Sequence, residues 1–271
     1  MDRILRMYAP NLIRDHTLCY IHNDVSGKSS VNEVAIEIVY ATAGVNIETE
    51  EYHDCLTLVL PQDVKIEDGD FLRVDEYETL LKWSGDRKAF TVVNSGFVSI
   101  SSKIQILKPI SVAVLTVSDK CSSGERIDTS GPELELLVEK IGGVVTDRKT
   151  VPDDMDEICA TLKDWTEKKY NLILTTGGTG LAERDVTPEA LLSVSEKIVP
   201  GFGELMRIKT LIDSPRAMLT RGLAVIRDKT VIVALPGSKK GASQCFNAIS
   251  VGLRHGVETL LGISHNCGEH K

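Results

Sequence analysis

The feature that most constrains the fold is a set of three continuous apolar runs in the second half of the chain. They are "SVAVLTVS" (111–118), "NLILTT" (171–176) and "TVIVALPGS" (230–238). An uninterrupted apolar run of this length is typical of a strand that is covered on both faces. Because segments of helical pattern separate the runs, the sequence predicts an α/β fold with a mostly parallel sheet flanked by helices.

The segments between these runs carry the start and stop signals of helices. Helices are expected over 130–143, over 154–169, after Thr187-Pro188-Glu189, and over 241–262, with helical or partly helical character at 201–212 and 215–226. Ser130 and Glu133 have the spacing of a capping box. The segment "VVTDRKTV" (144–151) is predicted to be a further strand, and either Asp153 or Asp154 is expected to cap the helix that follows it.

A boundary between two domains is expected within "SSKIQILKPIS" (101–111), which predicts domains at 1–108 and 109–271. Residues 1–108 have a net charge of −6 and the remainder a net charge of −2. Short apolar runs separated by turn residues predict a small β-rich or α+β module in the first part, of unknown role. One segment of it, "SSVNEVAIEIVYATAGV" (29–45), has the pattern of a short helix.

Composition excludes several classes of function. The net charge of −8 argues against sequence-independent binding to DNA or RNA, whose affinity depends on Lys and Arg. The six cysteines form no CxxC pair, and no apolar run is long enough to span a bilayer. The beginning of the chain lacks the apolar core of a signal peptide, so a cytoplasmic location is expected.

A glycine-rich loop follows the run at 171–176. Gly177, Gly178 and Gly180 allow a sharp turn that directs successive N–H groups to one point, and threonines at 175, 176 and 179 add hydroxyl groups. An anion such as phosphate suits this loop. A tight connection between a strand and a helix, without any ligand, is the alternative. The loop matches neither the Walker A nor the Rossmann pattern.

An arginine and an aspartate follow the glycines. Arg184 can neutralise a phosphate oxygen, and Mg²⁺ between Asp185 and phosphate oxygens would relieve their repulsion. Alternatively, Asp185 pairs with Arg184 or caps the next helix.

The other predicted strands also end in polar residues: Ser118-Asp119, Pro152-Asp153-Asp154, and Pro236-Gly237-Ser238, which Lys239 and Lys240 follow. Ligands of parallel sheets bind beyond the carboxyl ends of the strands, where these residues would meet. No Ser-His-Asp or Cys-His order is evident, so covalent nucleophilic catalysis is not expected.

Residues of about 110–262 resemble the MogA/MoaB family, which also includes the G domain of gephyrin-type proteins. Six segments agree in order and spacing: "LTVSDKCSSGERIDTSGP", "VPDD", "LILTTGGTGLAERDVTPEAL", "PGFGELMR", "AMLTRGLAVIR" and "ALPGS". The resemblance implies molybdopterin adenylyltransferase activity, with ATP and molybdopterin as substrates, Mg²⁺ as cofactor, and pyrophosphate as a product. It also implies a homotrimer, and transfer of the product to a separate protein that inserts molybdate.

By position, the resemblance makes Asp153 and Asp185 the carboxylates needed for chemistry, with Asp185 holding the metal. It assigns substrate and nucleotide binding to the polar strand ends and the glycine loop: Ser118, Asp119, Thr176, Gly177, Gly178, Thr179, Gly180, Gly237 and Ser238. The chain departs from the family at Lys239-Lys240, where the usual turn carries proline, and residues 1–108 lie outside the resemblance. A carrier without activity and a CinA-like nucleotide pyrophosphatase are the alternative functions.

Overall fold

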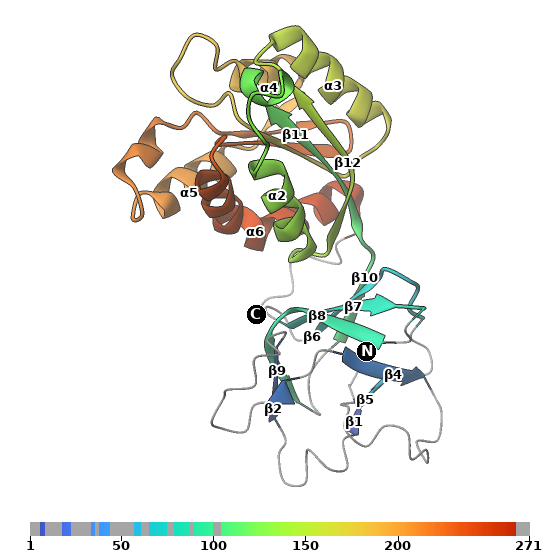
Figure 1. The fold of residues 1–271 in the computed structure, drawn as a ribbon. Coiled ribbons are helices and arrows are strands. Elements are labelled where there is room, and N and C mark those ends of the chain that lie inside the picture. The colour runs from blue at the N-terminus through green and yellow to red at the C-terminus, as the bar shows by residue number, and fades with distance from the viewer. Residues whose placement is uncertain are drawn as a thin grey trace. The chain divides into compact units, whose positions relative to one another are not determined.

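The computed structural model describes residues 65–74, 79–86, 89–99 and 104–263, and among the earlier residues the strands at 6–8, 18–22, 34–35, 38–43 and 57–60. The chain divides into two compact units, Met1–Pro109 and Ile110–Lys271. Figure 1 shows the described elements of both units.

In its described part, the N-terminal unit is built from strands. Seven of them form a sheet in the order β1-β5-β4-β8-β7-β6-β10, and three form a second sheet in the order β3-β2-β9. Most neighbouring pairs are antiparallel, and Phe71, Leu72, Leu81 and Phe90 are fully buried. The bounds are β1 Arg6–Tyr8, β2 Leu18–His22, β3 Val34–Ala35, β4 Ile38–Ala43, β5 Thr57–Leu60, β6 Phe71–Val74, β7 Thr79–Ser84, β8 Ala89–Asn94, β9 Gly96–Ser99 and β10 Ile104–Leu107.

The short helix expected over 29–45 is wrong. The described residues of this segment form β3 and β4, and β4 pairs with β5 on one side and with β8 on the other. Ile38, Val39 and Thr42 are β-branched, which favours a strand once partners are present on both sides.

The C-terminal unit contains a six-stranded sheet in the order β12-β11-β13-β16-β15-β14. The first four strands are parallel, and β15 and β14 continue the sheet in antiparallel fashion. The expected mostly parallel sheet is therefore confirmed, with an antiparallel edge in addition. The bounds are β11 Ile110–Val117, β12 Gly143–Val151, β13 Leu172–Thr176, β14 Lys197–Ile198, β15 Ala224–Arg227 and β16 Thr230–Leu235.

Helices cover both faces of this sheet (Figure 1). Side chains of α2, α5 and α6 pack with the strands in one hydrophobic cluster, and those of α3 and α4 pack in another. Every residue of β13 and β16 is buried, as expected for strands covered on both faces. The bounds are α1 Asp119–Ser122, α2 Ser130–Glu139, α3 Met155–Glu167, α4 Thr187–Val194, α5 Pro200–Thr210, the 3₁₀ helix η2 Pro215–Leu219 and α6 Lys239–Leu261.

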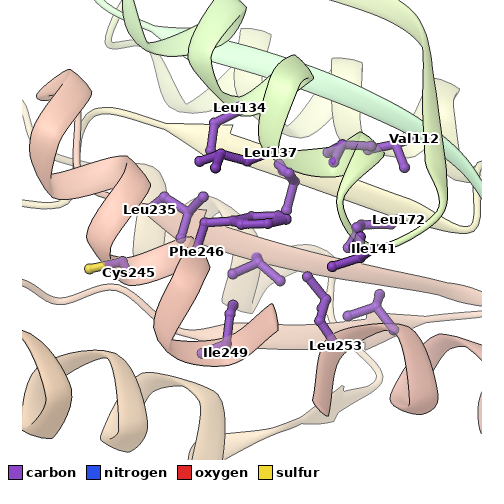
Figure 2. Packing of buried hydrophobic residues seen from close by; sticks show 14 of the residues in the cluster. Val112, Leu134, Leu137, Ile141, Leu172, Leu235, Cys245, Phe246, Ile249 and Leu253 are labelled. Carbon is purple, nitrogen blue, oxygen red and sulfur yellow. The ribbon is translucent and has the colours of Figure 1, made fainter. Parts of the chain in front are cut away.

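Figure 2 shows the larger of these clusters, in which Phe246 of α6 lies among side chains of α2 and of the strands. Phe246 is 1% exposed, and Leu134 and Leu253 are fully buried. Truncating a buried phenylalanine to alanine costs about 3–5 kcal/mol, so this layer holds the amino end of α6 firmly against the sheet.

One local expectation needs correction. The capping box of Ser130 and Glu133 does not form, because Asp128 Oδ1 accepts hydrogen bonds from the N–H groups of Ser130 and Gly131 instead. The segment 215–226 is partly helical, which the expectation included: η2 ends at Leu219, and the strand β15 begins at Ala224. Asp154 is the N-cap of α3, as the sequence allowed.

Candidate functional site

The four parallel strands of the C-terminal unit end at one edge of the sheet. Val117 of β11 lies beside Val151 of β12, and Thr176 of β13 lies between Thr116 of β11 and Leu235 of β16. The loops that follow these strands line a cavity of about 900 Å³. Of the residues that the sequence proposed for the site, those lining the cavity are Ser118, Asp153, Thr176, Gly177, Gly178, Thr179, Gly180, Asp185, Gly237 and Ser238, whereas Asp119 does not line it.

The glycine loop, Gly177–Val186, connects β13 to α4, and its residues 177–181 and Asp185 line this cavity. Gly177 has φ +107° and Gly178 has φ +61°, both in a region that side chains disfavour. A Cβ on Gly177 would lie 2.1 Å from the Val117 carbonyl oxygen, and one on Gly178 would lie 2.3 Å from Thr187 Oγ1. Packing therefore favours glycine at both positions, because the loop passes directly between the end of β11 and the start of α4 and leaves no room for a Cβ.

The threonine hydroxyls at this loop are not equally available. Thr175 Oγ1 donates to the Val233 carbonyl oxygen, and Thr176 Oγ1 donates to that of Pro236 at 2.8 Å. These two hydroxyls hold β13 to β16 and its following turn. Thr179 Oγ1 instead accepts from Thr220 Oγ1 at 3.4 Å, so its own hydrogen stays available at the cavity.

Thr187, the first residue of α4, was not singled out as a site residue in the sequence. Its Oγ1 is the buried side-chain polar atom that has no hydrogen-bond partner among the described residues. Both Thr187 Oγ1 and Asp153 Oδ1 lie beside Gly178, because a Cβ at Gly178 would approach each of them. An unpaired hydroxyl next to a carboxylate leaves hydrogen-bonding capacity here for water or a ligand.

Asp153 is held by a reciprocal pair of hydrogen bonds with Asp119. The Asp119 N–H donates to Asp153 Oδ2 at 2.9 Å, and the Asp153 N–H donates to Asp119 Oδ1 at 3.0 Å. Arg184 forms an ion pair with Asp119 at 2.8 Å, rather than with Asp185. Asp119 therefore connects the ends of β11 and β12, and its ion pair with Arg184 attaches the glycine loop to these two strand ends.

Asp185 closes its own turn, since its Oδ2 accepts from the Ala182 N–H at 2.8 Å. Arg221, which the sequence did not single out, supports the same loop from the segment before β15. Its Nε donates to the Gly180 carbonyl oxygen at 2.7 Å, and its guanidinium also donates to the Asp185 carbonyl oxygen and to Glu189. Burial alone would raise the pKa of Glu189, but the hydrogen bond from Arg221 holds that pKa below its usual value.

Asp128 and Arg126 form a further wall that sequence reasoning missed. Asp128 accepts from the Thr116 hydroxyl at 2.7 Å in addition to its bonds to the start of α2. Burial opposes ionisation of Asp128, yet these hydrogen bonds keep its pKa below the usual value. Arg126 Nη2 donates to Ser118 Oγ at 2.9 Å. An aspartate two residues before a predicted helix is the signal that could have identified this cap.

The charges on the cavity wall are balanced. The carboxylates are Asp128, Asp153 and Asp185, and the cations are Arg126, Arg216 and Lys239. Among the residues that the structure describes, no group of three or more His, Cys, Asp or Glu side chains is placed to hold a metal ion. Within the same part of the chain, no helix has the length and hydropathy of a membrane span.

Comparison with known proteins shows which proteins the C-terminal unit resembles. Residues 113–255 match the family described as "Probable molybdopterin binding domain". A molybdopterin adenylyltransferase of Helicobacter pylori (strain J99) is 38% identical over 159 residues, which cover 58% of this chain and 90% of that protein. Gephyrin of Dictyostelium discoideum is 41% identical over 157 residues, which are 54% of this chain but only 22% of that protein.

Solved structures agree with the sequence comparison. The molybdopterin biosynthesis enzyme MoaB of Thermus thermophilus is 41% identical, with a TM-score of 0.55 over 56% of this chain and 97% of that one. The tungsten cofactor synthesizing protein MoaB of Pyrococcus furiosus is 33% identical, with a TM-score of 0.53 over 57% of this chain and 98% of that one. The similarity covers a little more than half of the chain in both cases.

Proposed function

We propose a function on the premise that this chain belongs to the molybdopterin-binding domain family that residues 113–255 match. The C-terminal unit transfers an adenylyl group from ATP to molybdopterin, a step in the biosynthesis of the molybdenum cofactor. The observation that carries this proposal is the convergence of the glycine loop, Asp153 and Asp185 on one cavity.

The reaction joins two polyanions. A terminal phosphate oxygen of molybdopterin attacks the α-phosphorus of ATP, a new P–O bond forms, and the bond to the β-phosphate breaks so that pyrophosphate leaves with the electron pair. A phosphate nucleophile is already ionised near pH 7, so no general base is required. The barrier is then mainly one of positioning and charge, which fixed donors and cations lower.

The residues of the cavity have separable tasks in this scheme. The Thr179 hydroxyl and the N–H groups of the glycine loop after Gly177 bind phosphate oxygens, whereas the Gly177 N–H itself donates to the Leu235 carbonyl oxygen. Arg126 and Arg216 add positive charge at the wall. Asp119 is a positioning residue, since it fixes the Asp153 carboxylate without lining the cavity itself.

Mg²⁺ fits the donor set of this cavity. Asp153 and Asp185 each use Oδ2 to accept a main-chain hydrogen bond, and the Oδ1 atoms accept none from the described residues. Mg²⁺ commonly binds through one or two carboxylates together with substrate phosphates rather than in a cage of protein groups. We assign the metal to Asp185, with Asp153 assisting or orienting the attacking phosphate; when bound, the ion neutralises charge on the phosphates.

The assembly and the next step are further parts of the proposal. A homotrimer would cover apolar side chains of α5, of η2 and of the turn between them: Ile208, Ile212 and Met218 are 67%, 90% and 58% exposed. The adenylylated product would be consumed by a separate protein that inserts molybdate. A location in the cytoplasm is consistent with these substrates.

Pyrophosphate release tests the proposed activity. The full chain is mixed with molybdopterin, ATP and Mg²⁺, and pyrophosphate is followed over time. We expect release only when all three are present. Binding of molybdopterin without release would instead indicate a carrier, and nucleotide cleavage in the absence of molybdopterin would indicate a pyrophosphatase.

A further inference from the structure

Lys239 is a cation at the cavity wall to which the proposed function gives no role. It is the first residue of α6 and directly follows the Pro236-Gly237-Ser238 turn. That turn touches the glycine loop, because a Cβ on Gly237 would lie 3.0 Å from the Cα of Gly177. Lys239 lines the cavity, whereas the adjacent Lys240 does not.

In the structure the Lys239 ammonium group is paired with Glu133 of α2. Lys239 Nζ lies 3.0 Å from Glu133 Oε2, and the two side chains are 59% and 23% exposed. An ion pair with this exposure contributes little to stability, since water screens it and two flexible side chains must be ordered to form it. The pair can therefore open at small cost when a more highly charged partner enters the cavity.

Glu133 keeps a partner when Lys239 leaves. Ser243 Oγ lies 3.3 Å from Glu133 Oε1 and 2.9 Å from the Lys239 carbonyl oxygen, and its single hydrogen can turn to either. The lysine holds the pKa of Glu133 below its usual value, chiefly by its hydrogen bond, so Glu133 is a carboxylate and competes for the ammonium group.

We propose that Lys239 binds a phosphate group of the substrates, and that Glu133 holds the ammonium group beside the cavity until phosphate displaces it. This inference rests on the proposed function, since it assigns a specificity residue to the same cavity. The polyphosphate of ATP and the terminal phosphate of molybdopterin both carry the anionic oxygens that this ammonium group would bind. Lys239 then offsets part of the negative charge that three cavity carboxylates contribute.

Binding measurements on the full chain test this assignment. Dissociation constants for ATP, inorganic pyrophosphate and molybdopterin are measured by calorimetry for Lys239→Met and for the matched control Lys240→Met. Loss of a charge-assisted hydrogen bond corresponds to a roughly tenfold or larger rise in the dissociation constant. We expect this rise for Lys239→Met with at least one of the three ligands, little change for Lys240→Met, and substantial recovery with Lys239→Arg.

The variant Glu133→Gln tests whether the ion pair with Lys239 opens when phosphate binds or only maintains the shape of the cavity. If Glu133 competes with phosphate, its neutralisation leaves binding unchanged or tightens it, by up to about fivefold. If the pair only shapes the cavity, Glu133→Gln weakens binding as Lys239→Met does, and the proposal is wrong. Unchanged binding of all three ligands by Lys239→Met also overturns it.

These binding measurements and the pyrophosphate-release assay together distinguish this inference from the proposed function. If wild-type protein releases no pyrophosphate but Lys239→Met weakens ATP binding, the assignment of Lys239 stands and the adenylyl transfer does not. If the wild type is active and Lys239→Met binds every ligand normally, only the assignment of Lys239 fails. Thermal unfolding of each variant verifies that the fold is intact.

Discussion

Asp153 and Asp185 reach the cavity from two different loops of the C-terminal unit, and these loops hold the two carboxylates in different ways. In the turn after β12, Asp153 is tied to the neighbouring strand end by the reciprocal bonds with Asp119. In the glycine loop, Asp185 is tied within its own turn, and Arg221 supports the loop from outside. The position of Asp153 therefore depends on the neighbouring ends of the parallel strands β11 and β12. The position of Asp185 depends instead on Arg221, which precedes the antiparallel strand β15.

The two loops agree in the feature that bears on chemistry. Each carboxylate is fixed through one oxygen by a main-chain N–H, so orientation does not require a second charged side chain at that oxygen. The hydrogen bond to Oδ2 fixes the orientation of each charged carboxylate, and Oδ1 is left for a cation or a ligand. Two different supports therefore present a carboxylate to the cavity in the same way, and variants of each support can be tested separately.

The largest effect is expected from Asp185→Asn. The amide retains an oxygen for the Ala182 N–H, so the turn should persist while the negative charge is lost. Removing one preorganised electrostatic group typically costs a factor of about 10²–10³ in kcat. The measurement is the rate of pyrophosphate release at saturating ATP and molybdopterin.

Glu183→Gln is the matched control, because Glu183 is an exposed acid of the same loop that does not line the cavity. It should retain the rate of the wild type. Near-normal turnover by Asp185→Asn would remove Asp185 from the mechanism.

The next largest effect is expected from Arg221→Met, which breaks the outer support of the glycine loop. The carbonyl oxygens of Gly180 and Asp185 and the carboxylate of Glu189 lose their donor. Hydrogen bonds to charged groups are worth about 1.5–3 kcal/mol each, so turnover should fall at least tenfold and the melting temperature should drop. Pyrophosphate release and thermal unfolding measure these two effects, and an unchanged rate of release would show that the loop keeps its shape without Arg221.

A smaller effect is expected from Asp119→Ala, which breaks the support of Asp153 instead. The main-chain bond from Asp119 to Asp153 survives, but the return bond and the ion pair with Arg184 are lost. We expect kcat to fall roughly tenfold through displacement of Asp153, with KM changing less than kcat. Asp119→Asn, which can still accept the Asp153 N–H, should recover much of this loss; equal defects in both variants would contradict a positioning role.

The smallest effect on activity, and a clear one on stability, is expected from Asp128→Asn. Because hydrogen bonds depress the pKa of folded Asp128, its ionised form stabilises the fold above the unfolded pKa of about 3.9, and this contribution is lost as the pH falls through the lower folded pKa. The variant should lose about 1–2 kcal/mol of unfolding free energy at pH 7, and less below pH 3. Urea unfolding at both pH values measures this, and an equal loss at both would contradict it.

Much of the C-terminal unit could be predicted from the sequence because its signals are local. The apolar runs at 111–118, 171–176 and 230–238 predict buried parallel strands, and parallel strands bring their carboxyl ends to one edge. This is why residues as distant as Ser118 and Gly237 could be expected in one site. The strand β15 was harder, because "GLAVI" has no length or periodicity that separates strand from helix.

The remaining features depend on contacts that no local pattern encodes. Arg221 lies 36 residues from Asp185, and nothing in its surroundings in the sequence indicates that it supports the glycine loop. Likewise, Asp119 has the spacing of a cavity residue but turns to Asp153 instead. In the N-terminal unit, the segment that includes β4 has a pattern compatible with a helix, and only pairing with β5 and β8 makes it a strand.

In the proposed function, Asp153, Asp185 and the glycine loop form one site in which the adenylyl group, with its α-phosphate, moves from ATP to molybdopterin. The most direct measurement follows ATP labelled at the α-phosphorus during incubation with the full chain, Mg²⁺ and molybdopterin. The label should appear in a pterin-containing product in an amount equal to the pyrophosphate released. Label found only in free AMP, or remaining in ATP while molybdopterin is bound, would contradict this transfer.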